Sequence, residues 1–337
     1  MTTAAYLPEQ YAENIVLASA VPVIPDSHDV RTDAGRIAAV AEWMAFEELP
    51  LPKYLGGFPV QGGREQIIDF TMTAASIDFA FTDFGTGKRF EVDHQGATWS
   101  DSDALFACLH RALEAGIPVL DGHFLAQVSA EQLGEILQGS ITIPMLAERA
   151  EILRGVGEVL VREFGGRFTG LVEAAARGLH RPDGTGIVDL LTSRIARFDD
   201  VSPYGEHRVR FDKLAQLAVW MVHTSLGGQA GFPLDDLDQM TAFADYIVPV
   251  GLDVLGILHY SNDLAAAIAS GRMVERDSTQ EVEIRAHTVY AIALLTDAIN
   301  KIRPADRQVV MAQVDARLWT HYHTTFRPHH LTRTIMY

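Results

Sequence analysis

Apolar residues recur three and four positions apart over most of the chain, which is the spacing of one face of an α-helix. Two of these segments open on pairs with the spacing of a capping box, Ser100 with Asp103 and Ser129 with Gln132. Gly116 stands where a helix commonly stops. The pattern predicts helices over residues 33–49, 102–115, 129–137, 145–164, 211–226, 249–259 and 280–302.

Strand patterns are fewer and gather in the first third of the chain. The segment SIDFAF (76–81) alternates, and KRFEVDHQGATWS (88–100) has the form of a hairpin that turns near Gln95-Gly96. We therefore expect a mainly helical protein with a small antiparallel sheet in its first third.

With 337 residues, of which 48% are hydrophobic, the chain is long enough to bury a sizeable core. We expect one compact unit, residues 1–337, or two lobes. In the second case a sheet-bearing lobe covers residues 1–140 and a helical lobe covers residues 141–337.

The formal net charge of −17 repels polyphosphate, and the basic residues do not cluster in sequence. This argues against a nucleic acid strand as a partner and favours a small-molecule ligand. No apolar run reaches the length of a membrane span, and IVLASAVPVIP near the start lacks the basic flank of a secretory signal. The single cysteine, Cys108, cannot form an internal disulfide. We expect a cytoplasmic protein with no membrane partner. The sequence pattern does not indicate how many copies of the chain assemble.

Two short motifs suggest ligands but have simpler interpretations. GTGK (85–88) lacks the spacing of a phosphate-binding loop and lies inside a strand pair, which favours a hairpin turn. HYH and HH near the C-terminus suggest a metal, but residues two apart on a helix point to different faces, and no HExxH pattern supports them. The sequence predicts no metal and no cofactor. Cys108 has the pattern of a buried small hydrophobe, not of a nucleophile.

The stretch FADYIVPVGLDVLGILHYS (243–261) places Asp245 in a short joint between two apolar helical runs. A carboxylate at such a place most often caps the following helix, although Asp245 lies four residues before Pro249, early for the simplest cap. Phe243 and Tyr246 flank it. Aromatic side chains beside an acid can hold a planar base while the acid faces a sugar carbon, or they can belong to the core. Both interpretations remain open on the pattern alone.

Six segments, including the stretch around Asp245, resemble in order those of the queuosine 5'-phosphate N-glycosylase/hydrolase family, the queuine-salvage proteins. FADYIVPVGLDVLGILHYSNDL is similar to the family's F-A-D-Y-x-x-P element followed by L-G-x-L-x-Y-S. HHLTRTIMY resembles its H-x-x-R-x-I-x-Y ending. The other similar segments are WSDSDALFACLHRALEAGIPVL, ERAEILRGVGEVLVREFGGRF with its F-G-G-x-F, RVRFDKLAQLAV and QEVEIRA, spread from about residue 70 to the last residue. The chain has Asp78-Phe79-Ala80-Phe81 where the family has N-F-S-F.

The resemblance implies a fold related to the helix-hairpin-helix DNA glycosylases, and an N-glycosidase that releases queuine from queuosine 5'-monophosphate without a cofactor. Asp245 would stabilise the positive charge that develops on the ribose C1'. Lys213 would bind the 5'-phosphate or act on Asp245, unless it is an ordinary helix lysine.

The resemblance also implies substrate-binding residues. Candidates for the base pocket are Asp78, Phe79, Phe243 and Tyr246, and candidates for the phosphate are His330, Arg333 and Tyr337. Arg285, with Glu281 and Glu283, is a further candidate, for which a structural ion pair is the favoured alternative. Two other classes remain open at this point: a nucleic-acid base glycosylase, which needs a basic groove, and a nucleotide-binding protein without turnover.

Overall fold

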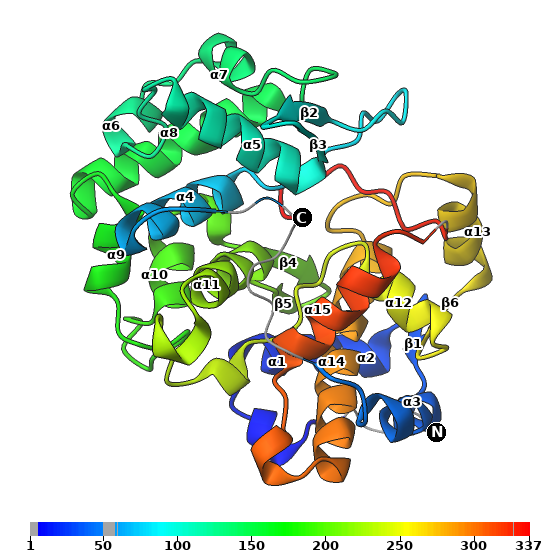
Figure 1. The fold of residues 1–337 in the computed structure, drawn as a ribbon. Coiled ribbons are helices and arrows are strands. Elements are labelled where there is room, and N and C mark those ends of the chain that lie inside the picture. Colours follow the sequence, from blue (N-terminus) through cyan, green and yellow to red (C-terminus); the bar gives the residue numbers. More distant parts are fainter. Residues whose placement is uncertain (1–5, 50–57, 59, 326) are drawn as a thin grey trace. The chain divides into compact units, whose positions relative to one another are not determined.

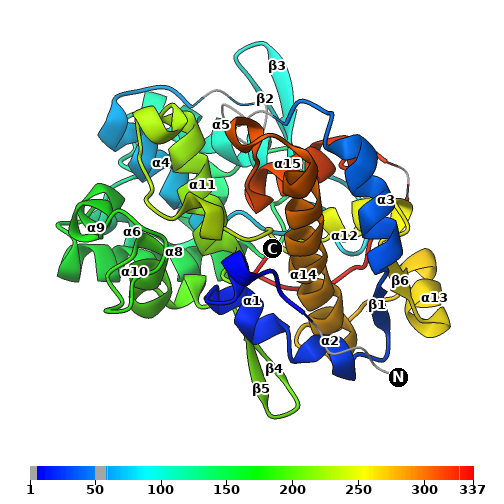
Figure 2. The ribbon, with the colours of Figure 1, turned by 90° about the horizontal axis from the view of Figure 1, so that it is seen from below.

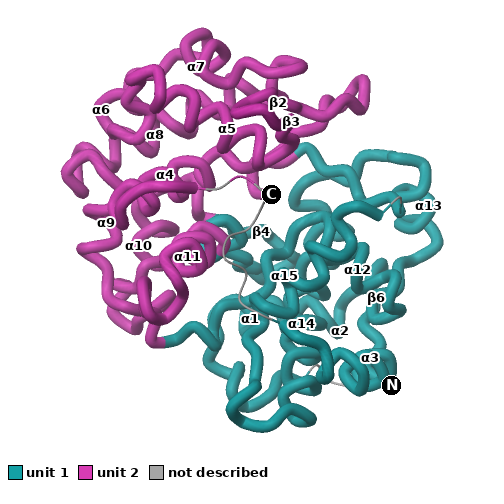
Figure 3. The backbone as a smooth tube through the Cα atoms, viewed as in Figure 1, with its two compact units in different colours: residues 1–52, 200–216, 236–333 teal, residues 53–199, 217–235, 334–337 magenta. Residues whose placement is uncertain are grey.

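The computed structural model describes residues 6–49, 58, 60–325 and 327–337. The protein is mainly helical, as predicted, and its described strands pair two by two in antiparallel fashion (Figure 1). The chain divides into two compact units, each assembled from separate stretches of sequence (Figure 3). Unit 1 holds residues 1–52, 200–216 and 236–333, and unit 2 holds residues 53–199, 217–235 and 334–337. Residue 140, the expected border between lobes, lies inside unit 2.

Unit 1 is built around one long helix, α14, whose residues are buried on nearly all sides. Because it is surrounded, α14 contacts α1, α2, α3, α12 and α15, and Figure 2 shows it between α1 and α3. The elements of this unit are η1 (Glu9–Tyr11), α1 (Ile15–Ala20), α2 (Val23–Asp26), β1 (Val30–Thr32), α3 (Ala34–Met44), β4 (Val201–Tyr204), β5 (His207–Arg210), η4 (Leu237–Gln239), α12 (Val248–Val254), β6 (Leu258–Tyr260), α13 (Asn262–Ser270), α14 (Thr279–Ile302), η5 (Ala305–Arg307) and α15 (Met311–Tyr322).

Unit 2 packs α4, α6, α7 and α9 around α8, and a hairpin of β2 and β3 lies against α5. The helix α11 (Lys213–Ser225) starts in unit 1 and ends in unit 2. The other elements of unit 2 are α4 (Arg64–Ser76), β2 (Glu91–His94), β3 (Ala97–Ser100), α5 (Asp101–Glu114), α6 (Gly122–Leu125), α7 (Ala130–Ile136), α8 (Leu146–Glu163), α9 (Phe168–Ala174), α10 (Ile187–Arg194), η2 (Ala196–Phe198) and η3 (Gly228–Ala230).

The helix expected over residues 249–259 is wrong at its C-terminal end. The helix α12 stops at Val254, and Gly256 follows with a φ of 71°, a left-handed conformation that ends helices. Leu258 then pairs with Thr32 in the β1–β6 pair. The partner strand lies more than two hundred residues earlier, so the local apolar spacing gave no sign of it.

Two expectations in the first third are also wrong. SIDFAF (76–81) is not a strand, because Arg149 of α8 donates to the backbone carbonyls of Ile77, Phe79 and Ala80 and so occupies groups that a sheet would need. Ser100 makes no side-chain cap at α5. Among the described residues, the first third holds the β2–β3 hairpin and the strand β1, which pairs with the distant β6.

Other local predictions are confirmed. The hairpin turns at Gln95-Gly96, both with positive φ, between β2 and β3. Ser129 and Gln132 form the predicted capping box of α7. GTGK (85–88) is a turn in which Asp83 accepts the N–H groups of Gly85 and Thr86. Within the described residues, none of the helices is long and apolar enough to cross a membrane.

Candidate active site

Asp245 lies just before α12 in unit 1, with 6% of its surface exposed. Its Oδ1 accepts the N–H groups of Ile247, at 2.8 Å, and Val248, at 2.9 Å. The helix α12 begins at Val248, one residue before Pro249. Asp245 is therefore close enough to accept hydrogen bonds from the N–H groups at the start of this helix, although it lies four residues before Pro249. These bonds fix the orientation of the carboxylate. From the described residues, no hydrogen bond reaches the second oxygen, Oδ2.

A second carboxyl group, that of Asp315 on α15, lies beside Asp245. Its Oδ2 accepts the N–H of Phe243 at 2.9 Å, two residues before Asp245 in the chain. Burial raises the pKa of Asp315 well above its usual range, and the negative charge of Asp245 raises it further. The fold therefore favours the protonated form of Asp315 more than the unfolded chain does.

Lys213, the first residue of α11, brings a positive charge to the same region. Its own N–H donates to Asp200 Oδ2 at 3.2 Å, and the residue is 7% exposed. Its charge lowers the pKa of Asp315 against the effect of burial. Within the described part of the chain, its ammonium group has no hydrogen bond or ion pair. A buried ammonium without a carboxylate partner is suited to an anionic ligand.

Arg285 on α14 holds the backbone around these groups in place. Its guanidinium donates two hydrogen bonds to Asp200, at 3.0 and 2.6 Å, and one from Nε to the carbonyl of Ala244 at 3.2 Å. It also lies 4.0 Å from the ring centre of Phe211. Arg285 thus links the residue before Asp245 to the carboxylate that bonds the N–H of Lys213. These contacts match the structural ion pair that the sequence favoured for it.

The two glutamates near Arg285 are engaged in the same structural way. Glu281 lies 3.7 Å from Arg285, and its carboxylate accepts the N–H of Asp277. Glu283 accepts three consecutive backbone N–H groups, those of residues 28–30, and the hydroxyl of Tyr204. Both side chains therefore anchor α14 to its surroundings.

Tyr246 and His330 lie near a small cavity of unit 1. The ring of Tyr246 contacts that of His329 in a tilted arrangement, with 4.4 Å between centroids and 32° between planes, and His329 and His330 both line the cavity. The volume of about 170 Å³ is too small for a nucleotide, because pockets for such ligands typically measure about 300 Å³ or more. Burial lowers the pKa of His330 to about 3, so this ring is uncharged at neutral pH.

The remaining predicted residues are placed separately. Arg333 is an exposed residue of unit 1, whereas Asp78, Phe79 and Tyr337 belong to unit 2. Asp78 accepts the hydroxyl of Ser102 at 2.7 Å. Phe79 is 2% exposed and lies between two guanidinium groups, those of Arg149 at 4.2 Å and Arg197 at 5.1 Å. Tyr337 is buried, with 5% of its surface exposed. Within unit 1, hydrogen bonds link Arg285 to Ala244 and to Asp200, and Asp200 to the N–H of Lys213. Asp315 bonds the N–H of Phe243 separately, and among the described residues Asp245 is joined to this group through the backbone alone.

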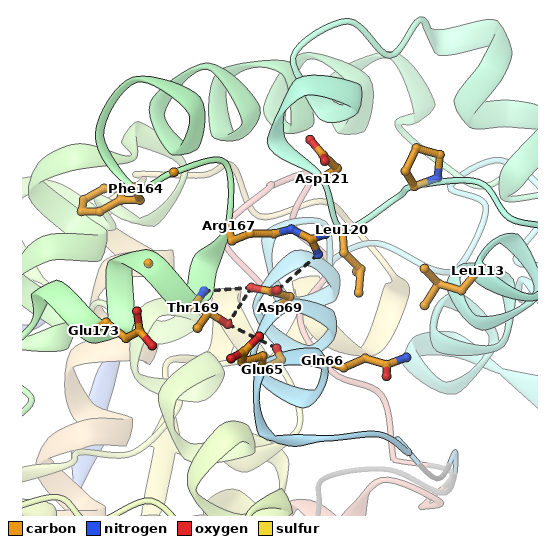
Figure 4. Close-up of a pocket in the computed structure, with 13 residues that line it drawn as sticks. Glu65, Gln66, Asp69, Leu113, Leu120, Asp121, Phe164, Arg167, Thr169 and Glu173 are labelled. Atoms are coloured by element: carbon orange, nitrogen blue, oxygen red, sulfur yellow. Dashed lines mark hydrogen bonds and ion pairs between the residues drawn. The ribbon is translucent and has the colours of Figure 1, made fainter.

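Unit 2 carries a hollow of about 640 Å³ that contains none of the predicted residues (Figure 4). Asp69 lies at its floor, where it accepts the N–H and hydroxyl of Thr169 and contacts Arg167 at 3.4 Å. Burial raises the pKa of Asp69. The other charged residues of the lining are Glu65, Asp121 and Glu173, so acidic groups outnumber the single arginine. A dianionic phosphate would be repelled here.

Sequence reasoning missed Asp315 and Asp200. Asp315 does leave a trace in the pattern, because it shares a helix face with Met311 and Leu318, both fully buried. An acid on the apolar face of a helix predicts a buried carboxyl group, which is rare in proteins unless the group has a partner or a function. Asp200 leaves no such trace, since it stands in the loop-like stretch before β4.

Comparisons with known proteins bear on the whole chain. A family model described as queuosine salvage protein matches residues 59–337. The chain is 34% identical over 325 residues to a protein of Sphaerobacter thermophilus, covering 96% of this chain and 97% of that protein. It is 28% identical over 331 residues to a protein of Mus musculus, covering 94% and 96%. Both relatives are named queuosine 5'-phosphate N-glycosylase/hydrolase.

Proposed function

This chain belongs to the queuosine salvage protein family, and from that membership we propose that it hydrolyses the N-glycosidic bond of queuosine 5'-phosphate. Water adds to the ribose C1', the bond from C1' to the base breaks, and a proton passes to the base. The products are queuine, which becomes available again for tRNA modification, and ribose 5-phosphate.

The arrangement around Asp245 carries this proposal. Bond cleavage develops positive charge on the ribose ring, as in glycoside hydrolysis. An acid that stabilises this charge must be ionised, held in place and open on one side. Asp245 has one oxygen fixed by two N–H groups, an Oδ2 without a hydrogen bond from the described residues, and an unpaired lysine charge in its region. It acts on C1' by electrostatic stabilisation or through a transient covalent bond.

The leaving group sets a second requirement. Queuine is a 7-deazapurine and has no N7 to protonate, so hydrogen bonds to its pyrimidine side must take up the departing charge. Phe243 and Tyr246 of unit 1 remain the proposed contacts of the base, and Asp78 and Phe79 of unit 2 stay candidates that rest on the family resemblance. Phe79 is the least suited to direct contact, because its ring is already covered by Arg149 and Arg197.

The fold relationship is part of the same proposal. A mainly helical protein with short strand pairs agrees with a relative of the helix-hairpin-helix DNA glycosylases. The net charge of −17 supports a free nucleotide instead of a nucleic acid strand as substrate. No cofactor is needed for this reaction, and we place the protein in the cytoplasm.

The test is to incubate the purified protein with queuosine 5'-monophosphate and to follow queuine by chromatography. We expect release of queuine by the wild type and nearly none by Asp245→Asn. The amide keeps an oxygen to accept the N–H groups of Ile247 and Val248, so the fold is retained, but the charge facing C1' is lost. The loss corresponds to on the order of 3 kcal/mol, about a hundredfold in rate or more.

Asp263→Asn is the matched control, since this acid is exposed in the same unit and pairs only with surface groups. Circular dichroism of both variants should equal that of the wild type. Release of queuine by Asp245→Asn at a near wild-type rate would remove Asp245 from the mechanism. Tight binding of the nucleotide by the wild type without any release would show a binding protein instead of an enzyme.

A further inference from the structure

A group of metal-ligating side chains forms in unit 2, away in sequence from every residue of the proposed mechanism. His94 is the last residue of β2, and the β2–β3 hairpin lies against α5 (Figure 1). His110 and Glu114 stand four residues apart on α5, so they share one face of that helix. The structure brings one nitrogen of each histidine and the carboxylate of Glu114 within 4.8 Å of one another.

The separations between these atoms are those of neighbouring ligands around a zinc ion. His94 Nε2 lies 3.2 Å from His110 Nδ1 and 3.6 Å from Glu114 Oε2, and His110 Nδ1 lies 3.5 Å from Glu114 Oε1. In a tetrahedral site with bonds of about 2.0–2.1 Å, two ligand atoms stand about 3.3 Å apart. The two distances to Glu114 refer to different oxygens, so one ion can reach both nitrogens and one carboxylate oxygen once the Glu114 side chain turns.

The three groups offer mainly acceptor atoms to one another. Of the two imidazole nitrogens, 3.2 Å apart, one can donate its hydrogen to the lone pair of the other, and the carboxylate of Glu114 can only accept. A cation satisfies all three groups at once, and a divalent ion does so without an added proton.

Contacts behind the ligands hold the two histidines in place. The carbonyl of His94 accepts the indole N–H of Trp99 across the hairpin at 3.1 Å. The ring of Phe58 lies against both histidines, with centroids 6.1 and 5.6 Å away. Glu114 has a half-exposed side chain, and it accepts from Gln95 Nε2 at 3.2 Å. One side of the group is therefore open to solvent, as a fourth ligand from water requires.

We propose that His94, His110 and Glu114 bind one divalent transition-metal ion of the zinc class, with water in the fourth position. Two nitrogens and one carboxylate oxygen favour zinc over magnesium or calcium. The ion connects the hairpin to α5, so it acts on the local stability of this part of unit 2. The site goes beyond the proposed hydrolysis and has no part in it. It also departs from the sequence prediction, which found no metal site.

The test is a calorimetric titration of tag-free, chelator-treated protein with Zn²⁺ at about pH 7, with Mg²⁺ in parallel. We expect one Zn²⁺ per chain with a Kd in the micromolar range or tighter, and no binding of Mg²⁺ of comparable strength. Glu114→Gln and His110→Asn should each weaken binding of Zn²⁺ by about tenfold or more. Titration with Co²⁺ should give the visible absorption of a tetrahedral site in the wild type.

His123→Asn is the matched control, because His123 forms an exposed pair with Asp121 elsewhere in unit 2. Its affinity for Zn²⁺ should equal that of the wild type. Urea unfolding without metal serves as the folding control for both ligand variants. Absence of stoichiometric binding to the folded wild type, or binding that survives the double variant Glu114→Gln/His110→Asn, would overturn the proposal.

Discussion

The carboxyl group of Asp315 shares a buried region with the charge of Asp245, and this makes protein stability depend on pH. Burial and Asp245 raise the pKa of Asp315, so the folded protein binds this proton more tightly than the unfolded chain does. The stabilisation is complete below the ordinary aspartate pKa of about 3.9, and it is lost as the pH rises through the higher folded value.

We predict that Asp315→Asn flattens this decline in stability. The amide is neutral at every pH, and its oxygen can still accept the N–H of Phe243. Urea unfolding at a series of pH values above the ordinary aspartate pKa should show the variant gaining stability relative to the wild type as the pH rises. Parallel curves for the two proteins would show that Asp315 is not protonated in the fold.

At this scale the sequence nominated Asp245 together with Lys213, Phe243 and Tyr246, but it missed Asp315 and Asp200. Asp245, Lys213 and Asp315 come from three separate stretches of the chain, and only folding brings their charges together. The same limit applies to His94 and His110, which are sixteen residues apart on a hairpin and a helix. The histidines that lie close together in sequence are those near the C-terminus, and no local pattern connects His94 to His110.

Among the helices, α14 carries a buried histidine whose ionisation opposes folding. His287 is 2% exposed, and Thr32 of β1 contacts its Nδ1 at 2.8 Å. Its Nε2 has no hydrogen-bond partner among the described residues. Burial lowers the pKa of His287 from 6.5 to about 4. Because the unfolded chain binds this proton more readily, the stability from His287 is present above pH 6.5 and is lost as the pH falls towards 4.

The full effect of His287 corresponds to about 3 kcal/mol. We predict that His287→Gln loses less stability than the wild type on acidification over this range, because glutamine can bond Thr32 but does not titrate. His259→Gln is the control, since His259 is partly exposed in the same unit. Urea unfolding of the three proteins between about pH 7 and pH 4.5 measures the difference. An unchanged pH dependence in His287→Gln would contradict the assigned burial effect.

Element prediction from sequence succeeded where the cause is local. The capping box at Ser129 and the turn at Gln95-Gly96 depend only on neighbouring backbone groups, and both were predicted. The predictions of helices and strands were wrong where contacts with residues distant in sequence determine the local structure. Arg149 donates hydrogen bonds to backbone carbonyls of SIDFAF that a strand would need for pairing. Leu258, expected in a helix, instead pairs with β1 as part of β6.

The charge of the whole molecule imposes a requirement on phosphate binding. A chain with a net charge of −17 repels a dianionic monophosphate unless cationic groups are focused at one place. Of the proposed phosphate ligands, Lys213 and Arg333 can supply charge. His330 cannot at neutral pH, because its pKa is lowered to about 3, although its ring can still donate one hydrogen bond.

We therefore predict that kcat/KM for queuosine 5'-monophosphate exceeds that for unphosphorylated queuosine by about tenfold or more, as one or two charge-assisted contacts provide. The binding energy of these contacts helps to position the ribose C1' next to Asp245. Lys213→Met and Arg333→Ala should reduce the preference, mainly by raising KM for the monophosphate.

Lys301→Met and Arg272→Ala are controls, since both remove an exposed cation of the same unit that already pairs with an acid. Paired initial-rate assays on the two substrates measure the ratio. If Lys213→Met lowers kcat equally for both substrates, the lysine acts on Asp245 and not on the phosphate. A preference that survives loss of both Lys213 and Arg333 would place the phosphate elsewhere.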